Sequence, residues 1–399
     1  MYGQDLFNTN SAVIKVMGIG GGGCNAVNSM IDSNVRSAEF IAVNTDNQAL
    51  LLSKAEKTIQ IGALLTKGLG AGSDPNVGEA AAEESKDIIA EALQGTDLLF
   101  IAAGMGGGTG TGAASVVARI ARELGILTVA VVTKPFAFEG RIRNENANKG
   151  ISNLKKYVDT LVIIPNDKLT QFLPANTGVL DAFKVADDML KQGIVGIVDL
   201  IATPSLINLD FADVNTVMRN QGLAHMGIGR AKGENRVIES VRQAVSSPLL
   251  ETTIEGAKSV ILNVSGGRDI TLSEITEAAQ LVQGIIDTNA NIIFGQTIDE
   301  SLNEEIKITI IATGFSPRPV ETVEEVMTVK PAIGVNNLED SSIPPLLRAF
   351  EKKEEVKPEP VVEEIQPEVV PEEPQVVSEP IKEKGKELPL FMRKLFGKK

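Results

Sequence analysis

The sequence has few of the features that mark secreted or membrane proteins. Its only cysteine is Cys24, so the 399-residue chain cannot form an internal disulfide, which fits a reducing compartment. No stretch of about 18 uninterrupted apolar residues occurs, and the N-terminal MYGQDLFNTNS lacks the basic start and apolar core of a secretion signal. These absences predict a cytoplasmic protein.

Positive charge and histidine are also scarce. The formal net charge is -14. Because binding to a phosphate backbone needs a basic face, this charge excludes nucleic acid as the main partner. His225 is the only histidine and has no cluster of cysteine or carboxylate residues around it in the sequence. We therefore expect no protein-built metal site.

Short apolar runs alternate with helical patterns in the first half of the chain. Asp74 and Pro75 predict the start of one helix that continues through EAAAEESKDIIAEAL, and Gly125 is expected to end another. Continuous apolar strands separated by helices are typical of a parallel sheet buried on both faces. The pattern predicts a doubly wound, mainly parallel α/β domain over residues 1–177. The runs are VIKVMGI at residue 13, FIAVNT at 40, DLLFIAA at 97, ILTVAVV at 126 and TLVIIP at 160.

Two further folded segments are expected after this domain. A long helical pattern, VLDAFKVADDMLKQGIVGIVDLI, begins a segment at residues 178–221 that we expect to form a central helix and a loop after it. Residues 222–315 have a different pattern, with strand-like runs and a helix opened by Thr271 with Glu274 three residues later. They predict a smaller α+β domain.

The C-terminal region changes composition twice. Residues 351–386 contain eleven glutamates, six lysines, six prolines and no aromatic residue. They cannot bury enough apolar surface to offset chain entropy, so residues 316–386 are expected to form a disordered linker. The last segment, ELPLFMRKLFGKK at 387–399, restores apolar side chains at helical spacing and predicts a short helix that docks on a partner.

A glycine-rich turn, GIGGGGCNA, follows the first strand. Gly18, Gly20 and Gly23 have the spacing at which backbone N–H groups and a helix N-terminus hold a pyrophosphate. Alone, this spacing fits a nicotinamide or flavin enzyme, another nucleotide site or a purely structural turn. In a nicotinamide-dependent oxidoreductase, Asp46 after FIAVNT would be the acid that binds the ribose.

A second glycine-rich loop, AAGMGGGTGTGAAS, follows the strand at residue 97. Its stretch from Gly106 to Gly112 offers consecutive backbone donors and two hydroxyls, which suits an anion. Two such loops at the carboxyl edge of one sheet indicate a polyphosphate. The chain has no G-x-x-x-x-G-K-[ST] motif, so amides, helix dipoles and Mg²⁺ would have to balance the phosphate charge.

The second loop resembles the tubulin signature in the form carried by the FtsZ branch of the tubulin family. The similarity continues in family order through VNTDNQAL at residue 43, KPFAFEGRIR at 134, IPNDKL at 164 and DLIATPSLINLDFADV at 199. It implies a GTPase that binds GTP or GDP with Mg²⁺, polymerises head to tail and forms the cytokinetic ring at the bacterial division site.

The resemblance also implies partners and a location. The protein would lie in the cytoplasm, concentrated at midcell on the inner face of the membrane. Its membrane association would be indirect, through tethering adaptors such as FtsA that bind residues 387–399, where division regulators would bind too. The polymer itself would be a homopolymer.

Residue by residue, the resemblance implies which side chains surround the nucleotide. Both glycine loops would hold the phosphates, with Thr109 on the γ-phosphate side, and Glu139 and Arg143 would lie on the ribose and phosphate side. The family usually has asparagine where this chain has Cys24, and a thiol there would make binding sensitive to oxidation. The expected nucleotide-binding residues are Gly20, Gly21, Gly22, Gly23, Cys24, Asn25, Gly106, Gly107, Gly108, Thr109, Gly110, Thr111, Gly112, Glu139, Arg143, Asn166, Phe183 and Asp187, of which Asn25, Asn166, Phe183 and Asp187 would surround the guanine.

These residues also have structural interpretations. Glu139 and Arg143, four apart on an expected helix, could form a surface ion pair. Phe183 could belong to the core, and Asp187 beside Asp188 could face solvent.

The catalytic residues are harder to identify, because neither glycine loop contains a base. Asn208, Asp210 and Asp213 in NLDFADV are polar side chains that could orient the attacking water. An aspartate before an apolar helical run is also a common helix N-cap, and the residues alone leave both interpretations open. In the family this segment reaches the nucleotide of the neighbouring subunit, so the resemblance implies an active site completed between two molecules.

Two other classes of function are alternatives to a polymerising GTPase. A nicotinamide-dependent oxidoreductase would use the first loop but leave the second loop and NLDFADV unexplained. A non-hydrolysing scaffold is opposed by the intact phosphate loops and the acidic segment.

Overall fold

The computed structural model describes residues 12–170, 173–174, 176–202, 210–247, 254, 256–287, 289–300 and 302–315. The expected catalytic residue Asn208, the expected linker and the terminal peptide lie outside these residues. Among the residues that the structure describes, no helix combines the length and apolar character needed to cross a membrane.

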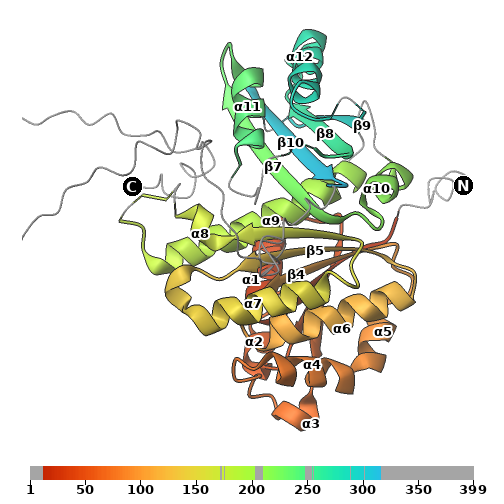
Figure 1. The fold of residues 1–399 in the computed structure, drawn as a ribbon, viewed down its shortest axis with the longest axis vertical. Coiled ribbons are helices and arrows are strands. Elements are labelled where there is room, and N and C mark those ends of the chain that lie inside the picture. The colour runs from red at the N-terminus through yellow and green to blue at the C-terminus, as the bar shows by residue number, and fades with distance from the viewer. Residues whose placement is uncertain are drawn as a thin grey trace, which may run out of the picture. The chain divides into compact units, whose positions relative to one another are not determined.

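The first half of the chain alternates strands and helices (Figure 1). Its elements are β1 (Ile14–Ile19), α1 (Gly20–Asp32), β2 (Glu39–Asn44), α2 (Asn47–Leu51), β3 (Lys57–Gln60), α3 (Ala63–Thr66), α4 (Pro75–Glu84), α5 (Lys86–Leu93), β4 (Leu98–Gly104), α6 (Thr109–Glu123), β5 (Leu127–Lys134), the 3-10 turn η1 (Ala137–Glu139), α7 (Arg141–Leu154), β6 (Thr160–Pro165) and α8 (Asn166–Leu169). The long helix α9 (Val179–Ala202) follows.

The remaining elements form a second, mixed sheet with helices. They are α10 (Phe211–Met218), β7 (Gly222–Lys232), α11 (Arg236–Val245), β8 (Ser259–Gly266), α12 (Leu272–Gln283), β9 (Asn291–Ile298) and β10 (Glu305–Thr313). The capping box expected at α12 is confirmed, because the Thr271 hydroxyl accepts from the Glu274 amide and the Glu274 carboxylate accepts from the Thr271 amide.

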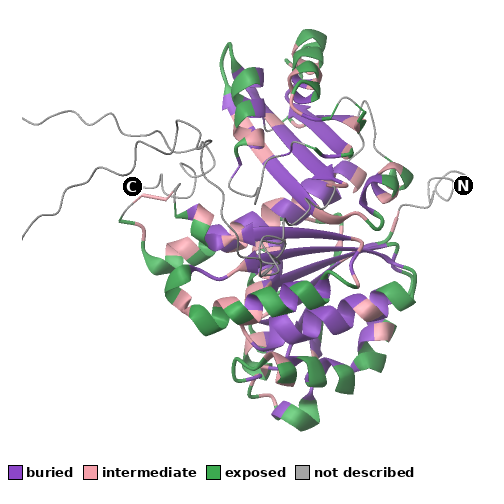
Figure 2. Ribbon diagram, in the orientation of Figure 1, coloured by how far each residue is buried: buried purple, intermediate pink, exposed green. Residues whose placement is uncertain are grey.

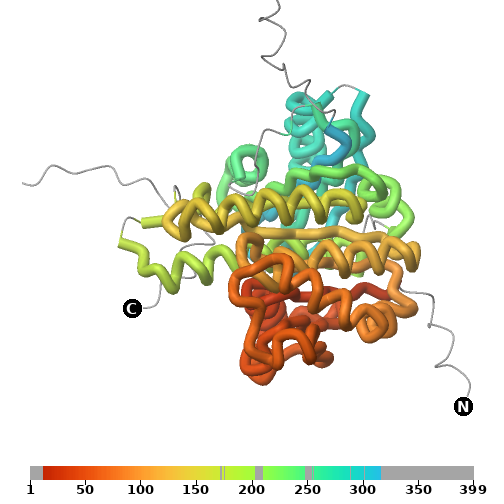
Figure 3. Tube along the Cα trace, turned by 60° about the horizontal axis from the view of Figure 1, so that its bottom comes forward, coloured from red at the N-terminus to blue at the C-terminus, as the bar shows by residue number. Residues whose placement is uncertain are grey.

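The expected doubly wound parallel sheet is confirmed. Strands β3-β2-β1-β4-β5-β6-β7 pair in this order, and every pair is parallel. Successive residues of β1 enter different cores, since Val16 packs with α1 and α9 on one face and Met17 packs with α4 to α7 on the other. Figure 2 shows these strands buried between helices whose outer sides are exposed, and Figure 3 shows α6 and α7 running side by side over one face.

Two local features differ from the sequence expectations, and a third agrees with them. The single helix expected after Pro75 is two helices, α4 and α5, because the backbone leaves helical geometry at Ser85 (φ -105°, ψ 16°). Strand β3 was not predicted, since its four residues are short and mostly exposed. The helix expected to stop at Gly125 does so: α6 ends at Glu123, and Gly125 has φ 76°.

Strand β7 joins the two sheets. Its residues 222–224 pair in parallel with β6, where Gly222 lies opposite Thr160, and its residues 225–232 pair antiparallel with β10. The ten strands therefore form one continuous order, β3-β2-β1-β4-β5-β6-β7-β10-β8-β9. Sequence patterns suggested two separate units, because the two pairing partners of a strand leave no signal in its own residues.

Candidate functional site

Two helix N-termini meet at the carboxyl edge of the parallel sheet. Helix α1 begins at Gly20 after β1 and α6 begins at Thr109 after β4, and neither helix has a side-chain cap. Because β1 and β4 are neighbouring parallel strands, both turns lie at the same edge. They are in close contact, since a Cβ added at Gly20 (φ 71°) would lie 2.8 Å from the Gly110 amide nitrogen. The structure thus brings together the two loops found in the sequence.

The glycines of these loops serve two different purposes. Some allow close packing: a Cβ at Gly23 would lie 2.2 Å from the Ala102 carbonyl oxygen, and one at Gly112 would lie 2.0 Å from that of Pro75. At Gly21 and Gly107 a Cβ would meet nothing within 4 Å. Open space therefore lies beside two uncapped helix starts, where free backbone N–H groups and the helix dipole favour an anion.

The two threonine hydroxyls of the second loop differ in role. The Thr111 hydroxyl is buried and accepts from the Gly106 amide at 2.8 Å, so it constrains the loop. Thr109 Oγ1 lies 2.7 Å from Thr45 Oγ1, and both residues are buried. Sequence reasoning missed Thr45, although it stands in the VNTDNQAL motif directly after β2.

Asn166 lies at the start of α8, directly after β6. It is only 4% exposed, and its Oδ1 has no hydrogen-bond partner among the residues that the structure describes. A buried amide oxygen without a donor destabilises a protein by about 1–3 kcal/mol, so such an atom calls for a ligand or water that donates to it. A nucleotide base or sugar has donors of this kind.

The first turns of α9 supply an aromatic surface and an unpaired carboxylate. Phe183, 37% exposed, packs edge-on against Phe136 with a centroid distance of 5.4 Å and against Phe138 at 6.3 Å. One turn later, Asp187 makes no hydrogen bond or ion pair with any described residue, whereas its neighbour Asp188 is paired with Lys191. Burial, and secondarily the charge of Asp188, raise the pKa of Asp187 from 3.8 to about 7. This environment opposes the solvent-facing interpretation of Asp187.

Glu139 and Arg143 do not share a helix, contrary to the sequence expectation. Glu139 ends η1 and Arg143 belongs to α7, with Gly140 at φ 104° between the two elements. The ion pair nevertheless forms, with 3.0 Å between Arg143 Nε and Glu139 Oε2. Glu139 Oε1 accepts from the Phe136 amide, so this carboxylate is engaged twice, while the half-exposed Arg143 keeps N–H groups for a ligand.

Cys24 lies under the first loop. Its thiol is buried beside Ala42 and Leu50 and contacts the carbonyl oxygens of Gly18 and Val43 at 3.6 and 3.7 Å. Burial raises the pKa of Cys24 to about 11. A buried neutral thiol is a poor nucleophile, so the structure opposes the oxidation sensitivity expected from the sequence. The neighbouring Asn25 is exposed.

Asp210 and Asp213 lie at the opposite, amino edge of the sheet. Asp210 Oδ1 accepts from the Asp213 amide at 2.8 Å, and Asp213 Oδ2 accepts from the Asp210 amide at 3.4 Å, so the pair caps α10 reciprocally. The other end of α10 is fixed at the beginning of β6, where the Thr160 hydroxyl donates to the Met218 carbonyl. The 24 residues of α9, about 36 Å long, connect the two edges (Figure 1).

Two further expectations concern Asp46 and metal ligands. The Asp46 carboxylate caps α2 by accepting from the Gln48 amide at 2.8 Å, which gives it a structural role and leaves the oxidoreductase hypothesis without support. In the described part of the chain, no group of three or more His, Cys, Asp or Glu side chains is arranged to hold a metal ion.

Comparisons with known proteins agree over both halves of the chain. Residues 13–174 match the model of the Tubulin/FtsZ family, GTPase domain, and residues 222–316 match that of the FtsZ family, C-terminal domain. An empty dimer of FtsZ from M. jannaschii is 47% identical, with a TM-score of 0.74 over 77% of this chain and 90% of that one. A point mutant of that FtsZ is also 47% identical, with a TM-score of 0.73 over 76% and 92%.

More distant structures share the fold alone. A GDP-bound monomer of CetZ1 from Haloferax volcanii is 21% identical, with a TM-score of 0.67 over 77% of this chain and 96% of that one. A GTPγS-bound protofilament of CetZ2 from the same organism is 20% identical, with a TM-score of 0.66 over 77% and 94%.

Proposed function

Since this chain belongs to the FtsZ family and is a GTPase that binds GTP and GDP, we propose that it polymerises head to tail and forms the cytokinetic ring at the bacterial division site. The observation that supports this proposal is the separation of two half-sites. The uncapped glycine loops lie at the carboxyl edge of the sheet, and the carboxylates of Asp210 and Asp213 lie at the amino edge. Similar structures include an FtsZ dimer and a CetZ2 protofilament.

We propose that the nucleotide lies along the carboxyl edge. Its phosphates would accept from the amides beside Gly21 and Gly107, where the structure leaves open space. The guanine would stack near Phe183, donate to the ionised carboxylate of Asp187 and satisfy the unpartnered Asn166 Oδ1. A guanine base offers an aromatic face for Phe183 and N–H donors for Asp187 and for Asn166 Oδ1.

Mg²⁺ is part of this proposal. Since the described residues offer no acidic cluster, the phosphates and water would supply most of its ligands, as is common for this ion. When bound, it would neutralise part of the phosphate charge that the amides and helix dipoles share.

The split site explains why neither loop contains a base. In a head-to-tail contact, the Asp210–Asp213 edge of one molecule would face the nucleotide of the next, and their carboxylates would orient the attacking water. A heterologous contact that does not close a ring continues as an open filament. Each new interface would complete one active site, so turnover should rise steeply with protein concentration.

Mixing two inactive variants tests this arrangement. Asp210→Ala should retain GTP binding but lose turnover, and Gly107→Val should fill the open space at the second loop and lose GTP binding. A mixture should recover turnover, because some interfaces join an intact loop to an intact acidic edge. Normal hydrolysis by Asp210→Ala alone, or co-sedimenting variants that stay inactive together, would contradict the proposal and leave Asp210 as a helix cap.

The terminal peptide supplies the proposed link to the membrane. Its apolar residues at Leu388, Phe391, Met392, Leu395 and Phe396 fit one face of a helix, which suits a groove on an adaptor such as FtsA or a division regulator. This contact would hold the filament at midcell on the inner face of the membrane. Deleting 387–399 should abolish adaptor binding and leave GTP turnover largely intact. Unchanged binding to adaptor-free anionic vesicles after the deletion would show that the peptide is not a lipid anchor.

A further inference from the structure

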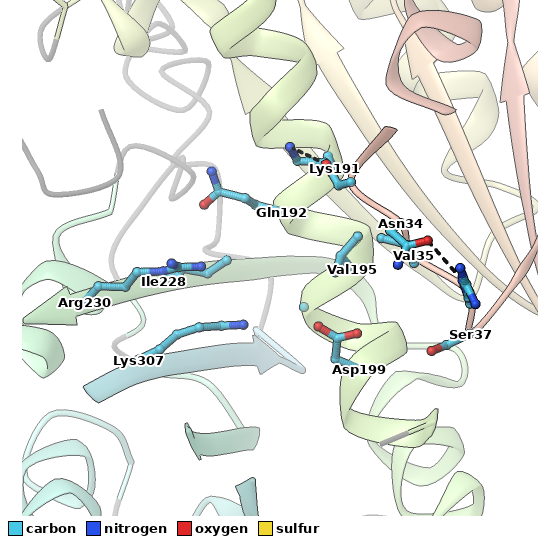
Figure 4. A pocket seen from close by; sticks show the side chains of 13 residues that line it. Asn34, Val35, Ser37, Lys191, Gln192, Val195, Asp199, Ile228, Arg230 and Lys307 are labelled. Carbon is cyan, nitrogen blue, oxygen red and sulfur yellow. Dashed lines mark hydrogen bonds between the residues drawn. The ribbon is translucent and has the colours of Figure 1, made fainter. Parts of the chain in front are cut away.

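A cavity separate from the proposed nucleotide site is lined mainly by positively charged side chains. It has a volume of about 450 Å³ and is bordered by the 33–37 loop, α9, β7 and β10 (Figure 4). Its lining contains one carboxylate, Asp199, and four cationic side chains, Arg36, Lys191, Arg230 and Lys307. The chain as a whole has a net charge of -14, so this concentration of positive charge runs against its overall composition.

Two of the cations stand directly opposite each other. Arg230 on β7 and Lys307 on β10 are register partners in the antiparallel pair, and Figure 4 shows both side chains extending toward α9. Like charges at directly opposite positions of a sheet destabilise it unless another group compensates them. A compensating anion is therefore expected in this place.

The protein compensates these charges only partly. Arg230 reaches Glu305 at 4.0 Å, and Glu305 also lies 3.7 Å from Lys232 on the same strand. Lys307 makes no hydrogen bond or ion pair with any residue that the structure describes. Burial first, and then the charge of Arg230, lower the pKa of Lys307, and the charges of Asp199 and Asp299 offset part of this shift. Burial raises the pKa of Asp199 across the cavity. Lys307 and Asp199 therefore lie on opposite sides of the cavity and do not form an ion pair with each other.

The other two cationic side chains, Lys191 and Arg36, contribute positive charge to the cavity but already have partners within the protein. Lys191 is paired with Asp188, and Arg36 donates to Asn34 Oδ1 at 3.0 Å. The neutral Gln192 side chain, which donates to Asp188 at 3.4 Å, also borders the cavity. A cleft lined by one sign of charge attracts and concentrates counter-ions of the other sign.

We propose that this cavity binds a small anionic metabolite, whose carboxylate or phosphate group lies between Arg230 and Lys307. The volume suits a small molecule and is too small for a folded partner. Such a ligand would contact the 33–37 loop, α9 and both strands at once. Its binding would therefore stabilise the folded protein and hold these elements together.

Calorimetric titration of the GDP-saturated full-length chain tests this site, because GDP fills the nucleotide site. One arm uses citrate and the other inorganic phosphate, so that the carboxylate and phosphate sources are distinguished. We expect saturable binding of at least one probe at one site per chain. Arg230→Gln should weaken that binding about tenfold or more, since a charge-assisted hydrogen bond is lost.

Two further variants make the test specific. Lys232→Gln removes a cation from the same strand and shares the partner Glu305, but it does not line the cavity, so binding should change less than about twofold. Asp199→Asn removes a carboxylate that lines the cavity and should tighten binding. The two cavity variants therefore shift affinity in opposite directions.

Several results would overturn the proposal. These are no saturable binding of either probe, equal weakening by Lys232→Gln and Arg230→Gln, or weaker binding by Asp199→Asn. Retained GDP affinity shows that each variant is folded. If Arg230→Gln fails to bind GDP, the direction of the Asp199→Asn effect decides the question.

Discussion

The two edges of the parallel sheet differ in whether their polar groups have hydrogen-bond partners. At the carboxyl edge, α1 and α6 begin without side-chain caps, Asn166 Oδ1 has no partner in the described part of the chain, and Asp187 has a raised pKa. At the amino edge, Asp210 and Asp213 cap each other's backbone. The polar groups at the carboxyl edge need a ligand to supply their hydrogen-bond partners, whereas Asp210 and Asp213 at the amino edge find partners within the single chain.

This difference decides how each edge must be tested. A ligand-facing group can be removed with little damage to the fold, because it is not engaged within the protein. The carboxylates at the amino edge already stabilise α10, so any catalytic role is added to a structural one. A substitution that removes both roles at once cannot distinguish them.

The largest effect is expected from Asp210→Asn. Asparagine is as good an N-cap as aspartate, so the free energy of unfolding should stay within about 0.5 kcal/mol. An amide cannot act as a charged acceptor for the attacking water, and turnover should fall by at least about a hundredfold. GTP binding by the monomer should be unchanged. The measurements are GTP turnover above the polymerisation threshold and urea unfolding.

The Asp210→Ala variant is the matched comparison. It should lose turnover to a similar extent and, in addition, about 1 kcal/mol of stability from the lost cap. If Asp210→Asn hydrolyses GTP normally while Asp210→Ala does not, the loss in alanine comes from the helix cap alone, and the catalytic assignment is wrong.

Asp187→Ala should weaken GTP binding next most strongly. Removing a buried acceptor leaves the base donors unpaired, which weakens binding by about 1–3 kcal/mol, or roughly tenfold to a hundredfold. Asp188→Ala, compared with the parent at pH 8, where Asp187 is ionised, is the control, because Asp188 is paired with Lys191 and its loss should then change GTP affinity little. Equal GTP affinity in the parent and Asp187→Ala would exclude Asp187 from the base site.

The raised pKa of Asp187 gives this site a pH dependence. The folded protein holds a proton up to about pH 7 that the unfolded chain releases near 3.8, so this group lowers stability progressively as pH rises between these values. GTP affinity should move the other way and increase as Asp187 ionises near pH 7. Asp187→Asn should remove both trends, as measured by GTP titration and urea unfolding between pH 5 and 8.

Much of the fold could be predicted because burial leaves a continuous pattern. Strands covered by helices on both faces read as unbroken apolar runs, as in LLFIAAG of β4. The break at Ser85 could not be predicted, since no glycine or proline marks it. The double pairing of β7 was also missed, because strand partners are set by tertiary contacts and not by local sequence.

The site was predictable where glycine was required. Gly20 has positive φ and touches the second loop, so only glycine fits there and its spacing is visible in the sequence. Asn166 and Asp187 were identified by family resemblance, because the identity of a single asparagine or aspartate does not predict whether its side chain is buried. Thr45 was missed for a similar reason: its contact with Thr109 joins residues 64 positions apart.

Gly21→Ala and Gly20→Ala should separate ligand contact from packing. At Gly21 an added Cβ meets no protein atom within 4 Å, so stability should be unchanged or slightly higher, while GTP affinity should fall about tenfold as the methyl group enters the phosphate space. At Gly20 the positive φ and the 2.8 Å approach to the Gly110 amide should destabilise the fold by roughly 1–3 kcal/mol. Thermal unfolding and GTP titration of both variants are the measurements. A Gly21→Ala protein that binds GTP normally would place the phosphates elsewhere.

The smallest effect is expected from Cys24→Ala. The thiol lies under the loop and makes only long contacts with two carbonyl oxygens, so its removal should destabilise the fold by about 1 kcal/mol and change GTP affinity less than about twofold. Because the pKa of Cys24 is raised to about 11, little thiolate exists at pH 8. Iodoacetamide should therefore modify the folded protein far more slowly than the urea-unfolded chain, with or without GDP. Rapid modification that GDP prevents would instead place the sulfur in the nucleotide site.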